Sequence, residues 1–380
     1  MLIEVRGVQF VNKGAELMLH AVLKKVGEAF PDASFAMAPS GKGDYVKRAR
    51  LGLYQKVWLK KYGMHLEWVI PQKLRRLFGL ILDKEVDLVL DASGFTYSDQ
   101  CLASSSVNMA SHVKRWKKRG ATVVLLPQAF GPFTSTETRN AFAFVVANSD
   151  LVFARDEVSY QHLIGLVGEQ ENIHQSPDFT NVVPGVLPDN PDKYRGRFCL
   201  IPNCRMVRDT SRRESEQYPS FCAMCLRLLI ELGQRPFILI HEGEGDVRIA
   251  ETILGKVEED IEIVKDGDAL RIKGLLGLCA GVISSRFHGL VSALSQGVPV
   301  LATGWSHKYE MLLREYDIQG SCLPVVVEPD VLRRQIQALV DDTMRGDVVS
   351  RISMAAAVHK ERTEVMWQRV FCAIHKGTSE

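Results

Sequence analysis

The stretch from Gly281 to Lys308, GVISSRFHGLVSALSQGVPVLATGWSHK, constrains the fold more than any other part of the chain. It opens with a short apolar run that is typical of a buried strand, and a second apolar run covers Val298–Thr303. Between them, Gly289–Gln296 carries its large apolar residues on one side, as a helix does, and Gly297 lies where that helix is expected to end. The pattern predicts a strand–helix–strand unit of a parallel sheet.

Charged residues gather at one end of this unit. Arg286 and His288 lie at the expected helix N-terminus, which carries partial positive charge and unpaired backbone N–H groups. An arginine there can hold a carboxylate or phosphate through two hydrogen bonds, and Lys308 follows the next strand at the same sheet edge. Each residue alone is more simply a surface or core-edge side chain. Together, at the carboxyl ends of parallel strands, they indicate an anion site.

Strands and helices alternate along the whole chain, which predicts two parallel-sheet domains of the α/β class. The length of 380 residues also suits two domains better than one core. Residues 186–197 are rich in proline and glycine and are expected to link an N-terminal domain, 1–185, to a C-terminal domain, 198–350. A last strand is expected at Val325–Val327. A terminal helix within 351–380 is suggested to pack back on the first domain.

The composition excludes several classes of protein. Hydrophobic residues make up 46% of the chain and charged residues 24%, as in ordinary globular proteins, and the net charge of +2 gives no reason to expect nucleic acid. No apolar run approaches the length of a transmembrane helix. The eight cysteines are scattered, and Cys222 and Cys225 lie in a helical pattern with no further metal-ligand pair nearby. These observations favour a reducing cytoplasm and a site without a metal.

Polar residues that follow predicted strands are further candidates for the site. Asn12 and Gly14 lie at a strand-to-helix turn, which either requires these residue types for its shape or forms a backbone cradle facing a ligand. Asp91 follows the apolar run VDLVL and serves either as a base or as a cap of its turn. Arg155 and Arg205 follow two other predicted strands. For Arg155 the alternatives are an anion ligand and a salt bridge to Asp156 or Asp178.

The segment between Gly41 and Gly79 differs from the rest of the chain by its charge. Its only acidic residues are Asp44 and Glu67, and Trp, Tyr and Leu residues are interleaved with the basic ones. A solvated helical face and a surface for an anionic glycan or a lipid-linked substrate both explain this pattern, and both stay open. The basic residues are Lys42, Lys47, Arg48, Arg50, Lys56, Lys60, Lys61, Lys73, Arg75 and Arg76.

Several motifs carry a resemblance to a known family. Ser285-Arg286-Phe287-His288-Gly289, Gly297-Val298-Pro299-Val300 and Lys308 resemble the C-terminal signature of the polysaccharide pyruvyl transferase family. Asn12-Lys13-Gly14-Ala15-Glu16 resembles the N-terminal motif of that family. Similar sequences occur at 127–132 (PQAFGP), 154–159 (ARDEVS) and 177–178, and a partial match at 91–97, so the resemblance spans nearly the full chain.

The resemblance implies a fold and an activity. The fold is a GT-B-like pair of Rossmann-like domains facing across a cleft. The activity is transfer of the pyruvyl group of phosphoenolpyruvate onto sugar hydroxyls of a polysaccharide or glycan precursor, which forms a ketal and releases phosphate. The implied partners are phosphoenolpyruvate, with no other cofactor, and a sugar or lipid-linked glycan acceptor. The cysteine pattern places the expected location in the cytoplasm, and the basic segment between Gly41 and Gly79 adds peripheral contact with the inner face of the membrane as an expectation.

The chemistry then assigns expected roles to the candidate residues. Phosphoenolpyruvate carries a carboxylate and a phosphate, so several cations are expected around it, with Asn12 and Gly14 in the same binding site. His288 is the expected general acid, because imidazole groups titrate near neutrality, and Asp91 is the candidate base. The alternatives are a GT-B glycosyltransferase that uses a nucleotide sugar and a non-catalytic partner in glycan assembly. The candidate cations are Arg155, Arg205, Arg286 and Lys308.

Overall fold

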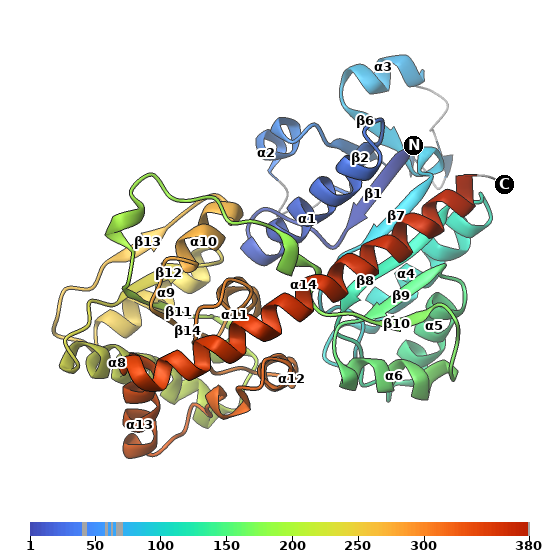
Figure 1. The fold of residues 1–380 in the computed structure, drawn as a ribbon. Helices are drawn as coiled ribbons and strands as arrows, with labels where there is room; N and C mark the ends of the chain where they lie inside the picture. The colour runs from blue at the N-terminus through green and yellow to red at the C-terminus, as the bar shows by residue number, and fades with distance from the viewer. Residues whose placement is uncertain (40–43, 58–59, 62–63, 66–70, 379–380) are drawn as a thin grey trace. The chain divides into compact units, whose positions relative to one another are not determined.

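The structure, a computed structural model, describes residues 1–39, 44–57, 60–61, 64–65 and 71–378 (Figure 1). The chain forms two compact units: the first comprises residues 1–11, 18–179 and 362–380, and the second comprises 12–17 and 180–361. Two helices, α1 (Lys13–Ala29) and α14 (Asp342–Thr378), therefore belong partly to each unit. Each unit has its own parallel sheet, so the predicted two-domain α/β fold is confirmed.

The first unit contains an eight-stranded sheet in the order β10-β9-β8-β7-β1-β2-β3-β6, in which neighbouring strands are parallel. The chain first builds outward from β1 towards β6 and then returns to β7, which lies on the other side of β1. The carboxyl ends of β1 and β7 therefore form the point where the strand order reverses, at which open α/β sheets bind ligands. The strands are β1 (Leu2–Arg6), β2 (Ser34–Met37), β3 (Tyr54–Val57), β6 (Leu80–Leu82), β7 (Leu88–Asp91), β8 (Thr122–Gln128), β9 (Leu151–Ala154) and β10 (Ile173–Gln175), with a separate antiparallel pair β4 (Lys60–Lys61) and β5 (Met64–His65).

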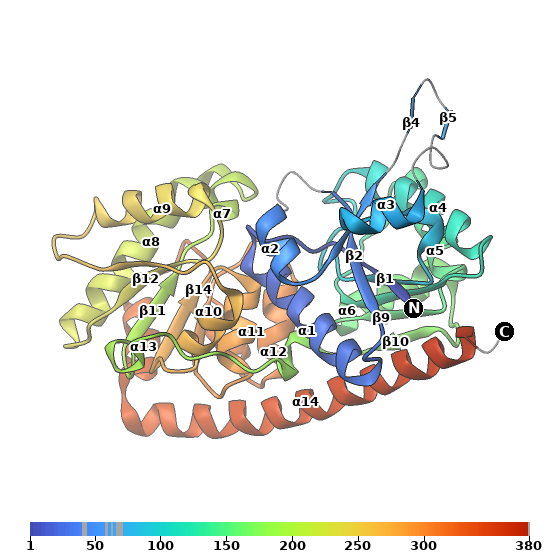
Figure 2. The same cartoon turned by 90° about the horizontal axis from the view of Figure 1, so that it is seen from above.

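Helices cover both faces of this sheet. The connections through α1, α2 (Tyr45–Arg50) and α3 (Gln72–Leu77) run towards β6, and those through α4 (Ala103–Lys117), α5 (Thr136–Ala147) and α6 (Glu157–Val167) run towards β10. Because such connections are right-handed, the two sets lie on opposite faces. The end of α14, red in Figures 1 and 2, also belongs to this unit. Its Phe371 packs edge-on against Phe30 at the end of α1, with 5.8 Å between ring centroids.

Charged side chains of the basic segment enter the interior of the first unit. Lys56, on β3, is fully buried, and its ammonium lies 2.5 Å from Glu4 Oε2 and 3.0 Å from Asp83 Oδ1. Arg75 is also buried and donates to Glu85 Oε2 at 2.9 Å. The prediction that these residues belong to a surface is therefore wrong for Lys56 and Arg75, because carboxylates inside the fold neutralise them. The side chains at 40–43 and 58–70 lie outside the described residues.

The second unit contains a five-stranded sheet in the order β13-β12-β11-β14-β15, again with parallel neighbours. Its strand order reverses between β11 and β14, so the carboxyl ends of these two strands form the expected ligand edge. The expected strand at Val325–Val327 is wrong, because Val325 and Val326 form a bend. The isolated bridge to Ala302 is made by Cys322, which precedes this stretch. The strands are β11 (Phe198–Ile201), β12 (Phe237–Ile240), β13 (Ile263–Lys265), β14 (Gly281–Ser284) and β15 (Val300–Ala302).

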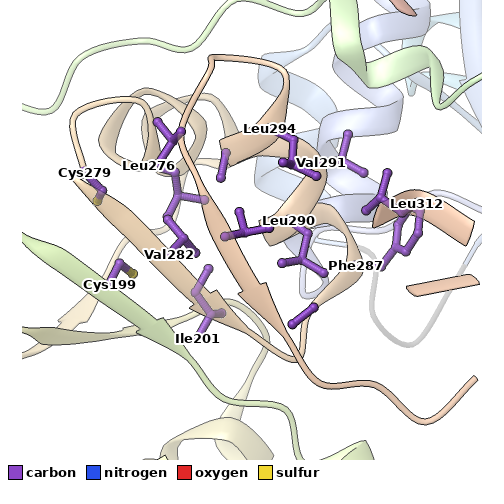
Figure 3. Packing of buried hydrophobic residues seen from close by; sticks show 14 of the residues in the cluster. Cys199, Ile201, Leu276, Cys279, Val282, Phe287, Leu290, Val291, Leu294 and Leu312 are labelled. Atoms are coloured by element: carbon purple, nitrogen blue, oxygen red, sulfur yellow. The ribbon is translucent and has the colours of Figure 1, made fainter. Parts of the chain in front are cut away.

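Two apolar layers enclose the second sheet. One contains buried residues of α8 (Arg212–Glu231), α9 (Glu244–Leu254) and α13 (Pro329–Val340). The other contains α10 (Ala269–Leu276), α11 (Phe287–Leu294), α12 (Lys308–Glu315) and the first part of α14. Figure 3 shows Phe287, Leu290 and Leu294 of α11 packed towards the strands in this layer. The buried apolar face of α11 thereby fixes its N-terminus at the carboxyl end of β14.

Residues 180–197, which include the expected linker, are part of the second unit. Val186 N donates to Leu270 O of α10 at 2.9 Å. A side-chain carbon at Gly274 would lie 2.0 Å from Val186 O, so the glycine permits this close approach. The stretch is therefore held against α10 over at least part of its length.

Candidate functional site

A buried set of hydrogen bonds fixes the turn between β14 and α11. Ser285 O accepts from Asn203 Nδ2 at 2.7 Å and from the Tyr309 hydroxyl at 2.9 Å. The Tyr218 hydroxyl donates to Ser285 Oγ at 2.8 Å and accepts from Asn203 N at 3.0 Å. These four residues are buried, so their polar groups bond to one another in place of water. A fully bonded buried network of this kind favours a single conformation of the turn. The turn that carries Arg286 and His288 is thus rigidly placed at the strand-order reversal.

Arg286 is held by two carboxylates of its own unit. Its side chain is buried, with 5% of the residue exposed, and its two terminal nitrogens donate to Glu242 and Asp246. Burial alone would lower the pKa of Arg286, but Asp246 and Glu242 raise it above its ordinary value. The sequence predicts Arg286 as a ligand for an anionic substrate. In the structure the guanidinium instead joins the turn after β14 to the turn after β12.

Asp246 connects three of the turns at this edge. It is fully buried at the start of α9, where its Oδ1 accepts from Cys204 N, and its Oδ2 from Glu242 N, both at 3.0 Å. With its bond to Arg286, it therefore links the segments that follow β11, β12 and β14. From its local sequence alone, Asp246 is predicted only to start or cap a helix. The available signal is a carboxylate shortly after an apolar strand, which does not reveal the partner 40 residues away.

The N-terminal motif is part of the second unit and lies against His288. Asn12 Oδ1 accepts from Gly14 N at 2.9 Å and from Ala15 N at 3.3 Å, which caps the start of α1. A side-chain carbon at Gly14 would lie 2.3 Å from His288 Nδ1, so only glycine allows this approach. The structure therefore brings the predicted residues Asn12, Gly14 and His288 together, although the sequence places the first two in the N-terminal domain.

Lys13 and His241 connect the N-terminal motif to the segment that follows β12. Lys13 N donates to His241 O at 3.3 Å, and Lys13 Nζ contacts Glu16 Oε2 at 2.6 Å and Gly267 O at 3.0 Å. His241 is buried after β12, and burial lowers its pKa well below the usual value, with further lowering by Arg286, His288 and Lys13. The imidazole of His241 is accordingly neutral at physiological pH.

Two other predicted cations meet at one aromatic ring. The Arg205 guanidinium carbon lies 3.8 Å from the centroid of the Trp305 ring, and Lys308 Nζ lies 4.6 Å from it. Arg205 also pairs with Asp209 at 2.5 Å, in a partly exposed ion pair. Lys308 Nζ is 5.5 Å from the ring of Phe287, which directly precedes His288. Sequence reasoning names Arg205 and Lys308 but overlooks Trp305, which brings them together.

The two predicted residues of the first unit have internal partners. Asp91 is fully buried at the end of β7, where its Oδ2 accepts from the Tyr97 hydroxyl at 2.6 Å and its Oδ1 from Ser93 N at 2.9 Å. These bonds match the capping alternative for Asp91. Arg155 follows β9 and is buried against Asp178 at 3.2 Å, which is the salt bridge named as its alternative role.

Other candidate ligand sites are weaker. A hollow of about 540 Å³ lies in the first unit between the end of α14 and the amino-terminal ends of β8 and β9, opposite to the edge where such sheets bind ligands.

Within the described residues, no three His, Cys, Asp or Glu side chains form a group suited to a metal ion. In the same part of the chain, no helix has the length and hydrophobicity needed to cross a bilayer.

Solved structures with the same fold include nucleotide-sugar enzymes. HepE from Anabaena, in complex with UDP-glucose, is 17% identical, with a TM-score of 0.60 and coverage of 100% of this chain and 99% of that chain. A putative UDP-N-acetylglucosamine 2-epimerase from Listeria monocytogenes is 13% identical, with a TM-score of 0.60 and coverage of 98% and 95%. The spinosyn forosaminyltransferase SpnP is 14% identical, with a TM-score of 0.55 and coverage of 98% and 99%. At these identities the likeness establishes a GT-B fold.

The family is established by sequence. No curated protein sequence matches the chain. The family model named polysaccharide pyruvyl transferase matches residues 12–307, a range that begins at Asn12 and includes Arg205, Arg286 and His288. The matched range covers most of the chain, including the strands of both parallel sheets other than β1, which precedes it. The chain is a transferase that belongs to the polysaccharide pyruvyl transferase family.

Proposed function

We infer that this protein transfers the pyruvyl group of phosphoenolpyruvate to two hydroxyls of one sugar in a glycan, forming a cyclic ketal and releasing phosphate. The observation that carries the inference is the grouping of Arg205 and Lys308 on Trp305, next to the turn that presents His288. Two cations at the carboxyl ends of parallel strands suit a donor with one carboxylate and one phosphate. Membership of the family gives the reaction class.

The reaction requires one proton to be placed on carbon. Protonation of the methylene carbon of phosphoenolpyruvate makes a methyl group and leaves positive charge on the neighbouring carbon. One sugar hydroxyl adds to that carbon, the C–O bond to phosphate breaks, and a second hydroxyl of the same sugar closes the ketal. Of the two hydroxyl protons, one replaces the proton used at the methylene carbon and the other leaves with phosphate.

We assign the residues by what each can reach. His288 is the proton donor, because its ring lies at the N-terminus of α11 on the ligand edge and is only half-buried. Arg205 and Lys308 bind the donor anions, and Asn12 and Gly14 shape the wall beside His288. The role of Arg286 is structural: it fixes the turn through its bonds to Glu242 and Asp246. Asp91 and Arg155 retain their internal partners and carry no step.

The test is phosphate release from phosphoenolpyruvate with a panel of acceptor glycans, with mass spectrometry of the glycan to detect the ketal. His288→Gln is expected to keep donor binding and lower kcat by about 10²–10⁴, as for a lost general acid. Lys308→Gln is expected to raise KM for phosphoenolpyruvate, whereas Lys256→Gln, an exposed control in the same unit, leaves it unchanged.

The same preparation distinguishes the alternative donor. Binding of the correct donor raises the melting temperature of the folded protein. Stabilisation by phosphoenolpyruvate and not by UDP-sugars supports the proposal. Stabilisation by a nucleotide sugar alone, without phosphate release from phosphoenolpyruvate, would assign the chain to glycosyl transfer instead.

A further inference from the structure

Large apolar side chains are exposed on two short helices of the first unit. On α2, Tyr45 is 68% exposed and the neighbouring Val46 is also exposed. On α3, Leu77 is 76% exposed, and Phe78, which directly follows the helix, is 64% exposed. Side chains of this size are rarely left in water in a group on a protein without a partner. We call the exposed residues of α2 and α3, together with Phe78, the α2–α3 surface.

The two helices belong to one region of the sheet. Helix α2 leads into β3 and α3 leads into β6, which are the last two strands at that edge. Their right-handed connections run in the same direction and therefore lie on the same face. A side-chain carbon at Gly79, just after α3, would lie 3.8 Å from the Arg48 guanidinium of α2. Figures 1 and 2 show both helices on the side of the first unit where β2 lies.

Positive charge accompanies these apolar side chains. Arg50 on α2 and Lys73 on α3 are exposed, and Lys47 and Arg76 are half-exposed. Asp44, which caps α2 through bonds from Val46 N and Lys47 N, is the acidic residue of the described part of this segment. The three buried cations, Lys56, Arg75 and Arg48, have partners inside the fold and do not contribute. The charge that remains at the surface is therefore net positive.

We propose that the α2–α3 surface docks the protein on a bilayer that contains anionic lipids. Leucine, valine and aromatic side chains insert at the level of the headgroups, and lysine and arginine at their margin attract lipid phosphates. A second copy of the chain is disfavoured as the occupant, because the two basic surfaces would repel each other. A free glycan gives no reason to expose Leu77 and Val46. The proposal is independent of the donor site, which belongs to the second unit.

The test is co-sedimentation of the full chain with vesicles of phosphatidylglycerol and phosphatidylcholine, compared with vesicles of phosphatidylcholine alone. We expect binding to the anionic vesicles that weakens at high salt, because the electrostatic part is screened. The double variant Leu77→Ser, Phe78→Ser should reduce binding by about tenfold or more, since apolar burial is lost. Lys73→Glu should reduce binding mainly at low salt.

Matched variants make the result specific. Leu102→Ser changes a side chain that is as exposed as Leu77, at 78%, but precedes α4 on the other set of connections, and it should bind like the wild type. Melting temperatures should be unchanged for all these exposed sites, so loss of binding does not reflect unfolding. Equal binding to both kinds of vesicle, no binding, or binding unaffected by the Leu77 and Phe78 changes would overturn the proposal. Phosphate release from phosphoenolpyruvate in the double variant shows separately whether the donor reaction is intact.

Discussion

Gly14 places His288 by having no side chain. The position is helical and its φ is not in the left-handed region, so backbone conformation alone does not require glycine there. The requirement comes from His288, whose Nδ1 lies 2.3 Å from where a Cβ would stand. A larger residue at position 14 would have to displace either the helix backbone or the imidazole of His288. Gly14 is thus tied to the position of the proposed proton donor.

We expect Gly14→Ala to lower kcat by displacing the His288 ring, by roughly tenfold or more, because a misplaced catalytic group loses much of its effect. Gly27→Ala is the matched control on the same helix, since open space surrounds that position. The control should keep full activity and gain about 0.5–1 kcal/mol of stability from helix propensity. The measurements are initial rates and urea unfolding. Equal activity of the two variants would contradict the role of Gly14.

Arg286 shows what the sequence predicts at the level of single residues and what it does not. Its position at the sheet edge follows from local signals, namely an apolar strand, a serine turn and a short helix. Its partners, Glu242 and Asp246, follow another strand, and nothing in the local pattern selects them. The sequence therefore predicts Arg286 as a ligand for a substrate anion, whereas in the structure its charge is balanced by two carboxylates of the protein itself. The same reasoning applies to Arg155 with Asp178.

At the scale of elements, β3 depends on a buried ion pair that crosses the sheet. Glu4 on β1 is paired in register with Ala36 on β2, and Ala36 with Tyr54 on β3, so Lys56 lies on the same face as Glu4. The small side chain of Ala36 lies between them. Burial would raise the pKa of Asp83, but Lys56 and a hydrogen bond from Trp116 hold it below its ordinary value.

We expect Lys56→Gln to destabilise the first unit by about 3–5 kcal/mol, because it removes the fully buried cation that Glu4 and Asp83 share and leaves these carboxylates only partners that are less buried, Arg6 and Arg119. Lys73→Gln is the comparison, since this lysine is exposed on α3 and should change stability by no more than about 0.5 kcal/mol. Both variants remove one positive charge from the same segment. Urea unfolding followed by Trp fluorescence measures the difference, and similar midpoints for the two would refute the assignment.

The strands of the two sheets were easier to predict from the sequence than the unit to which each helical segment belongs. Continuous apolar runs such as Thr122–Gln128, all seven residues of which are buried, mark strands covered on both faces. The helices between them follow from their apolar periodicity. The sequence does not show that residues 12–17 belong with the second sheet, because their contacts with that unit join segments far apart in the chain.

At the scale of the whole molecule, two histidines with lowered pKa values, His112 and His241, make stability depend on pH. Burial and, to a smaller extent, the nearby cations Arg6, Arg115 and Lys56 together lower the pKa of His112 from 6.5 to about 3. The unfolded chain takes up this proton below about pH 6.5, whereas the folded protein does not until about pH 3. The contribution of His112 is therefore fully present above pH 6.5 and is lost as the pH falls towards 3. His241, whose pKa is also lowered by burial, acts in the same direction.

We expect the free energy of unfolding to decrease on acidification from pH 7.5 to 4.5, with His112 contributing on the order of 2 kcal/mol once screening by solvent is included. His112→Gln should flatten this dependence, while its difference from the wild type at neutral pH reports only the change in packing. Urea unfolding at a series of pH values gives both quantities. An identical slope in the two proteins would exclude His112 as a source.

Helices α1 and α14 each belong partly to both units, and this affects the order in which a growing chain can fold. The strands of the first sheet are synthesised early, but the helix that packs on Phe30 is synthesised after all of them. The second unit already has all its segments when residue 361 emerges, whereas the first still lacks 362–380. Nascent chains stalled when residue 361 has just emerged should therefore protect the later-made sheet from protease more completely than the earlier one.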